Sequence, residues 1–340
     1  MYAEDKNNPP CAGESSSSLA NLASSPGRFA KSLNMTVEQV DEAIEARKMA
    51  STTLNDRLIA LEEENKEKLT EAEIGRMKHQ MICQHRFQYL RNPFVCRKCW
   101  TFLPICVCHL FEQQKRNNRA GKCSKAQLPI GVEKIIVWTH HDEFGRTSNT
   151  GSLLPLGLEQ TDILMKGLPE HEQIMNEILQ SEDKLPVVLW PDKNSKRAST
   201  TITDLRGIIL ETTSSRGQTD ASRIGGIILI SIEGTWNNAR KMSNKLPQNV
   251  MRLDLSEEIR RNFTTTETKE GVFIDNKSLL APLRRQGEGA KQECVSTLEA
   301  TIIALLGLGW SAEDASFLLN CARTKVRRIQ EYTGKTYPRD

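Results

Sequence analysis

The sequence predicts an α/β fold built on a mainly parallel sheet, with a cysteine-rich module and an N-terminal helical arm before it. Three observations support this prediction. Short β-branched runs alternate with helical patterns after residue 132, four cysteines fall within thirteen residues, and a long polar helical pattern precedes both. With 340 residues, 38% of them hydrophobic, the chain is long enough to bury one large core or two smaller ones.

The N-terminal residues indicate where the protein works. They are acidic and polar and lack the apolar segment of a secretory signal. Nine cysteines without such a signal indicate a reducing compartment, and no window approaches the roughly 18 uncharged apolar residues of a membrane span. We therefore expect a cytoplasmic or nuclear protein that is not secreted and has no membrane partner.

Two segments precede the cysteines. Residues 1–35 are rich in Ser, Asn, Pro and Gly and are predicted to be a disordered tail. Residues 36–90 are predicted to form a helical arm, because residues 36–39 have the form of a capping box and the helical pattern continues to about Tyr89. Three sustained heptads are absent, which favours an amphipathic arm over a dedicated oligomerisation coil.

Charge is unevenly distributed along the chain. Residues 36–75 carry a net charge of −6 and residues 1–35 are neutral. Since the whole chain carries +3, residues 76–340 carry a net charge of +9. A moderate basic excess of this kind suits a polyanionic partner.

The cysteines predict a structural zinc site within residues 91–125, followed by a basic linker. Cys96 and Cys99 form a C-x2-C pair, and Cys106 and Cys108 form a C-x-C pair six residues later. Four thiolates close a tetrahedral zinc site and leave no open coordination position, so the metal is expected to be structural. His109 is predicted to be a bystander.

Residues 126–340 are predicted to form the main α/β domain, with helices on both faces of the sheet. The expected strands are Lys134–Thr139, Pro186–Trp190, Gly226–Glu233 and Asn249–Leu255. The expected helices are Ser152–Met165, Thr235–Asn244, Thr297–Leu308 and Ala312–Tyr332.

Three strand ends carry residues suited to ligand binding, because ligands of open parallel sheets bind beyond the carboxyl ends of the strands. Asn149–Gly151 leads into a helix and offers backbone amides to a carboxylate, or is a simple N-cap. Trp190-Pro191 ends a second strand. Glu233 ends a third and precedes Gly-Thr at a helix start, which indicates a ligand-gripping turn or a cap beside a packed Trp236.

Two further motifs are predicted to be structural when taken alone. His140, His141 and Glu143 do not have the spacing of one helical face, so no second metal is expected there. Ser296–Glu299 has the form of a capping box at a helix start.

These motifs, in this order, resemble the DTW-domain family of tRNA-uridine aminocarboxypropyltransferases over about residues 91–308. The cysteine pattern, the Asn-Thr-Gly loop and the Tyr-Pro type strand end are similar to the segments described above. The Asp-x-Thr-Trp motif that names the family is similar to residues 233–236, with Glu233 in place of the aspartate. The extra methylene displaces the carboxylate by about 1 Å. The Ser-Thr-x-Glu-Ala element is similar to residues 296–300.

The resemblance implies a SPOUT-like fold, with or without a knot, in which residues 126–340 bind S-adenosylmethionine. The implied reaction transfers the 3-amino-3-carboxypropyl group of that donor to N3 of a tRNA uridine and releases methylthioadenosine. The alternatives are a SPOUT-like RNA methyltransferase and an inactive, tRNA-binding relative.

The resemblance also assigns site residues. Glu233 is the candidate catalytic base for uridine N3, or else holds the donor's amino group. The expected donor-binding residues are Asn149, Thr150, Gly151, Trp190, Pro191, Thr235, Trp236, Ser296, Thr297 and Glu299. The expected tRNA contacts are Lys115, Arg116, Arg119, Arg240, Lys241, Arg284 and Arg285, joined by Arg323, Lys325, Arg327 and Arg328 of the last predicted helix.

Overall fold

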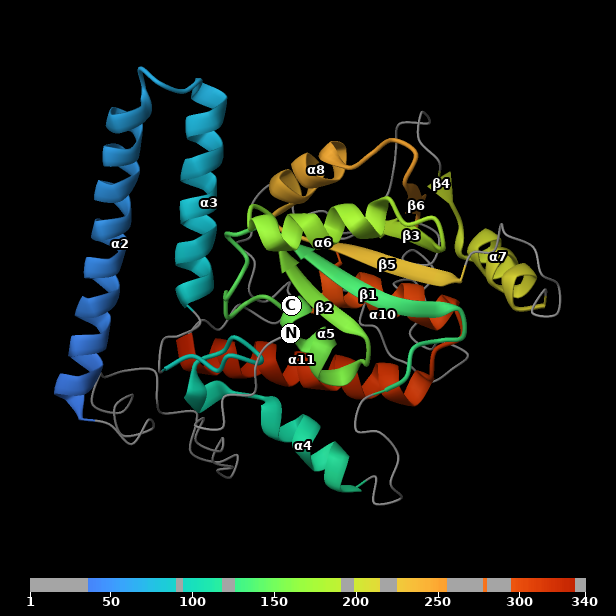
Figure 1. Ribbon diagram of the computed structural model, residues 1–340. Coiled ribbons are helices and arrows are strands. Elements are labelled where there is room, and N and C mark those ends of the chain that lie inside the picture. The colour runs from blue at the N-terminus through green and yellow to red at the C-terminus, as the bar shows by residue number, and fades with distance from the viewer. Residues whose placement is uncertain are drawn as a thin grey trace.

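The computed structural model describes residues 36–89, 94–117, 126–190, 199–214, 225–255, 278–279 and 295–333. This part of the chain is a mixed α/β fold around one parallel sheet (Figure 1). The predicted disordered tail lies outside the described residues, as do residues 118–125 of the predicted basic linker.

The sheet has the strand order β2-β1-β5-β3-β6-β4, and every pair is parallel. In chain order the strands are β1 (Val132–Thr139), β2 (Thr161–Met165), β3 (Lys184–Leu189), β4 (Ser199–Thr200), β5 (Gly226–Glu233) and β6 (Met251–Leu253). All eight residues of β5 are buried, as expected of a central strand whose β-branched side chains are covered on both faces.

Alternate residues of the central strands enter two different cores. On one face, Val137 and Leu229 pack with α10 (Thr297–Gly307) and α11 (Ala312–Thr333). On the other, Ile136 and Ile230 pack with α6 (Pro169–Leu179) and α8 (Trp236–Lys245). Figure 1 shows these two helix layers above and below the sheet. Two further helices, α4 (Cys108–Asn117) and α7 (Ile202–Ser214), add side chains to the first core.

The predicted helix Ser152–Met165 is wrong. This segment contains a 3-10 turn, η3 (Gly151–Leu153), one helical turn, α5 (Leu154–Gly157), and then strand β2. The backbone becomes extended at Leu158, directly after Gly157, and the β-branched Thr161 and Ile163 pair with β1 instead.

The N-terminal arm is a helical hairpin of α2 (Val37–Asn65) and α3 (Glu71–Tyr89). The capping box predicted at Thr36 is confirmed, with Gln39 as its partner. Glu62 of α2 pairs with Lys78 of α3. The hairpin stands beside the sheet with α3 on the inner side (Figure 1). Within the described ranges, no helix has the length and apolarity that crossing a membrane requires.

Candidate functional site

The four clustered cysteines converge on one buried point. Their sulfur atoms all lie within 4.8 Å of one another. The Sγ atoms of Cys96 and Cys108 are 3.6 Å apart. Those of Cys99 and Cys106 are separated by the same distance. Four thiol donors at this spacing fit a tetrahedral zinc ion, and the C-x2-C and C-x-C spacing alone predicted the group.

Local turns place these sulfurs. The Trp100 amide donates to the Cys96 carbonyl at 2.9 Å, which closes the knuckle, and Trp100 takes a positive φ of 61° to do so. The hydrogen bond with Cys106 lowers the pKa of Cys99 to about 6, whereas the pKa of Cys108 is raised, because the lowering effect of Cys106 is outweighed by its hydrogen bonds with Cys96 and Cys99 and by its burial. His109 is not part of the group and lies 3.4 Å from an Arg328 nitrogen instead.

The strand ends expected to bind a ligand gather at one edge of the sheet. Glu233 at the end of β5 pairs in register with Thr139 at the end of β1. The Thr297 hydroxyl donates to the Ile232 carbonyl at 3.3 Å, which brings the start of α10 to the same strand end. On the other side of β5, the rings of Trp190 and Trp236 lie 5.5 Å apart.

The loop at residues 149–151 lies directly against Glu233. A Cβ atom placed on Gly151 would be 2.9 Å from Glu233 Oε2, so a larger residue here would displace this carboxylate from the loop. Asn149 caps the turn, since its Oδ1 accepts from the Ser152 amide at 3.0 Å. The Thr150 hydroxyl is buried and has no hydrogen-bond partner among the described residues.

The motif at residues 233–236 combines a buried acid with an exposed aromatic ring. Glu233 is buried, whereas the Trp236 side chain is 51% exposed. Thr235 caps α8 by accepting from the Asn238 amide at 3.3 Å. The cap is therefore present, but Trp236 is not the packed core residue that a purely structural turn would have.

The capping box at the start of α10 is confirmed, with Ser296 and Glu299 as its members. The buried Glu299 carboxylate also accepts from the Ser278 hydroxyl and the Leu279 amide, both at 2.8 Å. Glu299 therefore fastens a distant segment to α10, a contact that local sequence does not indicate.

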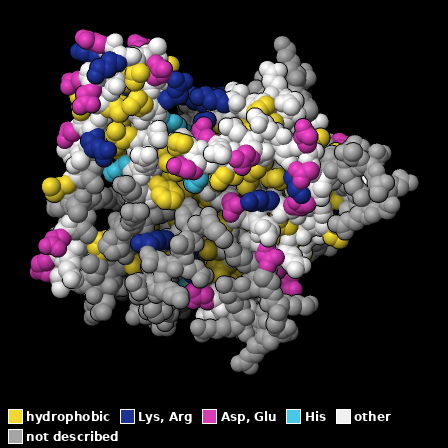
Figure 2. All heavy atoms as spheres, in the orientation of Figure 1, with side chains coloured by type: hydrophobic (Ala, Val, Ile, Leu, Met, Phe, Trp, Pro, Cys, Tyr) yellow, Lys and Arg dark blue, Asp and Glu magenta, His cyan; other side chains and the backbone are white. Residues whose placement is uncertain are grey.

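The predicted tRNA contacts have different surroundings. Arg240 and Lys241 are exposed on α8, and Figure 2 shows Lys and Arg side chains gathered between the upper part of α3 and α8. Lys115 and Arg116 lie in α4. Arg119, Arg284, Arg285 and the expected donor-site residue Pro191 lie outside the described residues.

Lys325 does not contact solvent, so its predicted phosphate contact is wrong. Its ammonium is fully buried and donates to the Asn149 carbonyl at 2.5 Å and to the Cys99 carbonyl at 2.7 Å. The sequence carried a signal for this, because Cys321, Ala322 and Val326 place Lys325 on the apolar face of α11. Arg328 is half-buried and donates to the Cys106 carbonyl at 2.5 Å.

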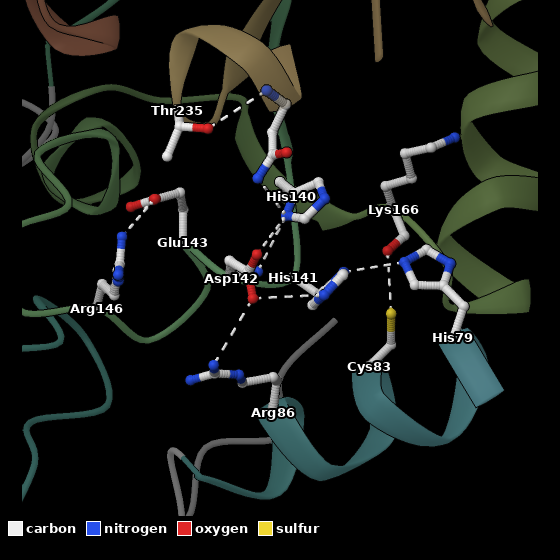
Figure 3. Close-up of polar contacts among 11 residues, drawn as sticks. His79, Cys83, Arg86, His140, His141, Asp142, Glu143, Arg146, Lys166 and Thr235 are labelled. Carbon is white, nitrogen blue, oxygen red and sulfur yellow. Dashed lines mark hydrogen bonds and ion pairs between the residues drawn. The ribbon is translucent and has the colours of Figure 1, made fainter. Parts of the chain in front are cut away.

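A histidine cluster beside these strand ends was missed at the sequence level. His79 and Cys83 of α3 meet His141, which follows β1 (Figure 3). Burial lowers the pKa of His79 and also that of His141, the latter to about 4. Glu143 points elsewhere and pairs with Arg146 at 2.6 Å. The i, i+4 spacing of His79 and Cys83 on one helix is the signal that could have revealed the cluster.

A comparison with protein-family models matches the DTW domain over residues 93–330. Searches of curated proteins and of solved structures found no match.

Proposed function

Because the chain belongs to the DTW-domain family, we propose that it is a tRNA-modifying enzyme that uses S-adenosylmethionine as a donor. The specific reaction is transfer of the donor's 3-amino-3-carboxypropyl group to N3 of a tRNA uridine. The proposal includes a structural zinc ion at the four cysteines and a SPOUT-like course of the chain.

One observation carries the proposal: the buried Glu233 carboxylate lies against Gly151, and the neighbouring Thr150 hydroxyl is buried with no partner in the part of the chain that the structure describes. An unpaired buried hydroxyl is costly, and a ligand oxygen would satisfy it. The Thr150 hydroxyl would donate to the carboxylate of the donor's amino-acid arm. With the donor's carboxylate held by this loop, the Glu233 carboxylate beside it would lie next to the uridine that attacks the donor.

Glu233 is proposed to accept the uridine N3 proton. The N3–H bond breaks toward the Glu233 carboxylate, and the freed electron pair forms the bond to the γ-carbon of the aminocarboxypropyl group. The C–S bond of the sulfonium breaks, and its electrons stay on sulfur in methylthioadenosine. Because a sulfonium releases a neutral thioether readily, the residues at this edge of the sheet contribute chiefly orientation and proton transfer.

The two tryptophans are proposed to receive the RNA base. Trp236 is half exposed and its ring lies 5.5 Å from that of Trp190. Aromatic rings at a protein surface stack unpaired bases, which is the usual way of recognising single-stranded RNA. Arg240 lies four residues after Trp236 on α8, and therefore on the same helix face, where it would contact a phosphate.

The decisive experiment uses S-adenosylmethionine that carries a label in its carboxyl carbon. Incubation with unmodified tRNA is expected to move the label into RNA and to release methylthioadenosine. Release of S-adenosylhomocysteine, with no carboxyl label in the RNA, would establish a methyltransferase instead. Salt-dependent tRNA binding without either product would establish an inactive relative.

A further inference from the structure

Three potential metal ligands meet where the helical arm contacts the sheet. A nitrogen of His79, a nitrogen of His141 and the sulfur of Cys83 all lie within 4.8 Å of one another. His79 Nε2 and His141 Nδ1 are only 2.9 Å apart. Figure 3 shows the three side chains converging from α3 and from the loop after β1. The loop after β1 also brings His140, His141 and Asp142 together, but only α3 adds a thiol and a third imidazole at His141.

The backbone at the end of β2 closes over this cluster. The Cys83 thiol donates to the Lys166 carbonyl at 3.2 Å. The next residue, Gly167, has a φ of +97°, and a Cβ there would lie 2.5 Å from the Cys83 sulfur and 2.6 Å from His79 Cε1. Glycine is therefore favoured at residue 167 both by its positive φ and by the lack of space for a side chain. This close backbone holds Cys83 and His79 in place.

His141 is also oriented from its other side. Its Nε2 lies 3.5 Å from an Asp142 carboxylate oxygen, and that oxygen lies 3.7 Å from an Arg86 nitrogen. A histidine that binds metal through one nitrogen usually directs the other toward a carboxylate, which fixes its tautomer. This leaves Nδ1 directed at His79 Nε2 (Figure 3).

We propose that His79, Cys83 and His141 bind a zinc-type divalent cation. Two imidazoles and one thiolate are donors that zinc prefers, and three protein ligands leave a fourth position for water or a substrate oxygen. The site is separate from the four-cysteine cluster. The earlier expectation of no second metal considered only the loop residues, whereas α3 supplies the helical pair.

The metal would fasten the arm to the edge of the sheet that carries the candidate active site. His140, adjacent to His141, donates its amide to the Glu233 carbonyl at 2.8 Å. His79 and Cys83 both precede residue 93, where the family match begins. The proposed site therefore combines two residues of the N-terminal arm, which lies outside the family match, with one residue of the DTW domain.

The test is a zinc titration of the full-length protein, reduced and depleted of metal, against a chromogenic chelator. The wild type is expected to bind two equivalents. Cys83→Ser and His141→Ala are each expected to bind one. The matched controls are Cys321→Ser, which removes another buried thiol, and His85→Ala, which removes another histidine of α3; both are expected to bind two equivalents.

A second readout is the absorption spectrum with Co2+ in place of zinc. The thiolate-to-cobalt band of the second equivalent is expected in the wild type and in Cys96→Ser/Cys106→Ser, in which the four-cysteine site is disrupted. A wild type that binds a single equivalent overturns the proposal. So does a second equivalent that survives both Cys83→Ser and His141→Ala. A wild-type stoichiometry of one equivalent overturns the proposal whether or not the variants fold, and the cobalt band of Cys96→Ser/Cys106→Ser reports the second site without altering its ligands.

Discussion

At the scale of single residues, Lys325 links the two parts of the candidate site. Its ammonium donates to the Cys99 carbonyl in the knuckle, the Asn149 carbonyl and the Ser152 hydroxyl beside it. Burial lowers the pKa of Lys325 to about 8. A buried charge of this kind is tolerated only because every donor position has a partner. The cysteine module and the Asn149 loop are therefore fixed relative to each other.

Replacing Lys325 by methionine is expected to destabilise the protein by about 3 kcal/mol, because three buried acceptors lose the ammonium and the single Ser152 hydroxyl proton cannot replace it at both carbonyls. The measurement is the free energy of unfolding from a denaturant titration. Arg327→Met, on the exposed side of the same helix, is the control and should change it by less than about 0.5 kcal/mol. Equal effects in the two variants would remove the structural role assigned to Lys325.

Glu233 allows a graded test of the proposed base. Glu233→Gln keeps the size of the side chain and removes its basicity, so the transfer rate should fall by about a hundredfold or more. Glu233→Asp restores the family residue but withdraws the carboxylate by about 1 Å, and an intermediate loss is expected. Single-turnover rates with labelled donor measure both. A Gln variant that retains the wild-type rate would exclude proton transfer by Glu233.

At the scale of secondary-structure elements, α8 presents one aromatic ring and two basic side chains to solvent. Trp236, Arg240 and Lys241 are all exposed on it. Its buried side carries Ala239 and Met242 against the sheet. One amphipathic helix thus fixes the position of the predicted RNA contacts relative to Glu233.

Arg240→Ala/Lys241→Ala is expected to weaken tRNA binding and to reduce the slope of log affinity against log salt by about 1 to 2, since each phosphate contact releases counterions. Filter binding at several salt concentrations measures the slope. Lys134→Ala is the control, because Lys134 lies near the amino end of β1 and pairs with Asp162 at 2.7 Å. An unchanged slope in the double variant would place the RNA elsewhere.

Helix α6 is joined to β2 by a pH-sensitive contact. His171 Nδ1 accepts from the Met165 amide at 2.9 Å, and burial lowers the pKa of His171 below its ordinary value of 6.5. The unfolded chain therefore takes up this proton more readily than the folded protein as pH falls. This contribution to stability is present above about pH 6.5 and is lost progressively below it.

His171→Asn keeps an acceptor for the Met165 amide but cannot be protonated. We expect its free energy of unfolding to decline less steeply than that of the wild type between about pH 7 and pH 5. Burial also lowers the pKa of His79 and His140, and their contributions remain in the variant, so the decline is expected to become shallower without vanishing. Parallel denaturant titrations at several pH values compare the slopes, and identical slopes would contradict the assignment.

At the scale of the whole molecule, the cysteine module is part of the main core. Its four cysteines belong to the same buried cluster as Leu153, Leu229 and Leu305, which come from the loop, the sheet and α10. The knuckle is therefore not an independent appendage. Its stability and that of the sheet are coupled.

Removing the metal from the four-cysteine site is expected to lower the thermal midpoint of the entire α/β fold in one transition. Calorimetry before and after chelation measures this, and Cys106→Ser should reproduce the shift without chelator. Cys321→Ser is the control for loss of a buried thiol. A separate small transition, with the main midpoint unchanged, would show that the module unfolds alone.

Local patterns in the sequence predicted much of this structure. Capping at Thr36 and Ser296, the strand Gly226–Glu233 and the four cysteines all follow from spacing within a few residues. The interpretation of Ser152–Met165 as a helix failed because apolar periodicity over a short run does not distinguish a strand from a helix.

The sequence by itself determined the α/β class, the parallel sheet, the cysteine ligand group and the strand ends that form the candidate site. Only the tertiary structure decided that Lys325 is buried, that Glu233 lies against Gly151, and that His79 and Cys83 meet His141. The physical reason is the distance along the chain over which each interaction acts. Capping, alternation and knuckle spacing act within one turn or strand, whereas these contacts join segments whose proximity depends on how the helices pack on the sheet.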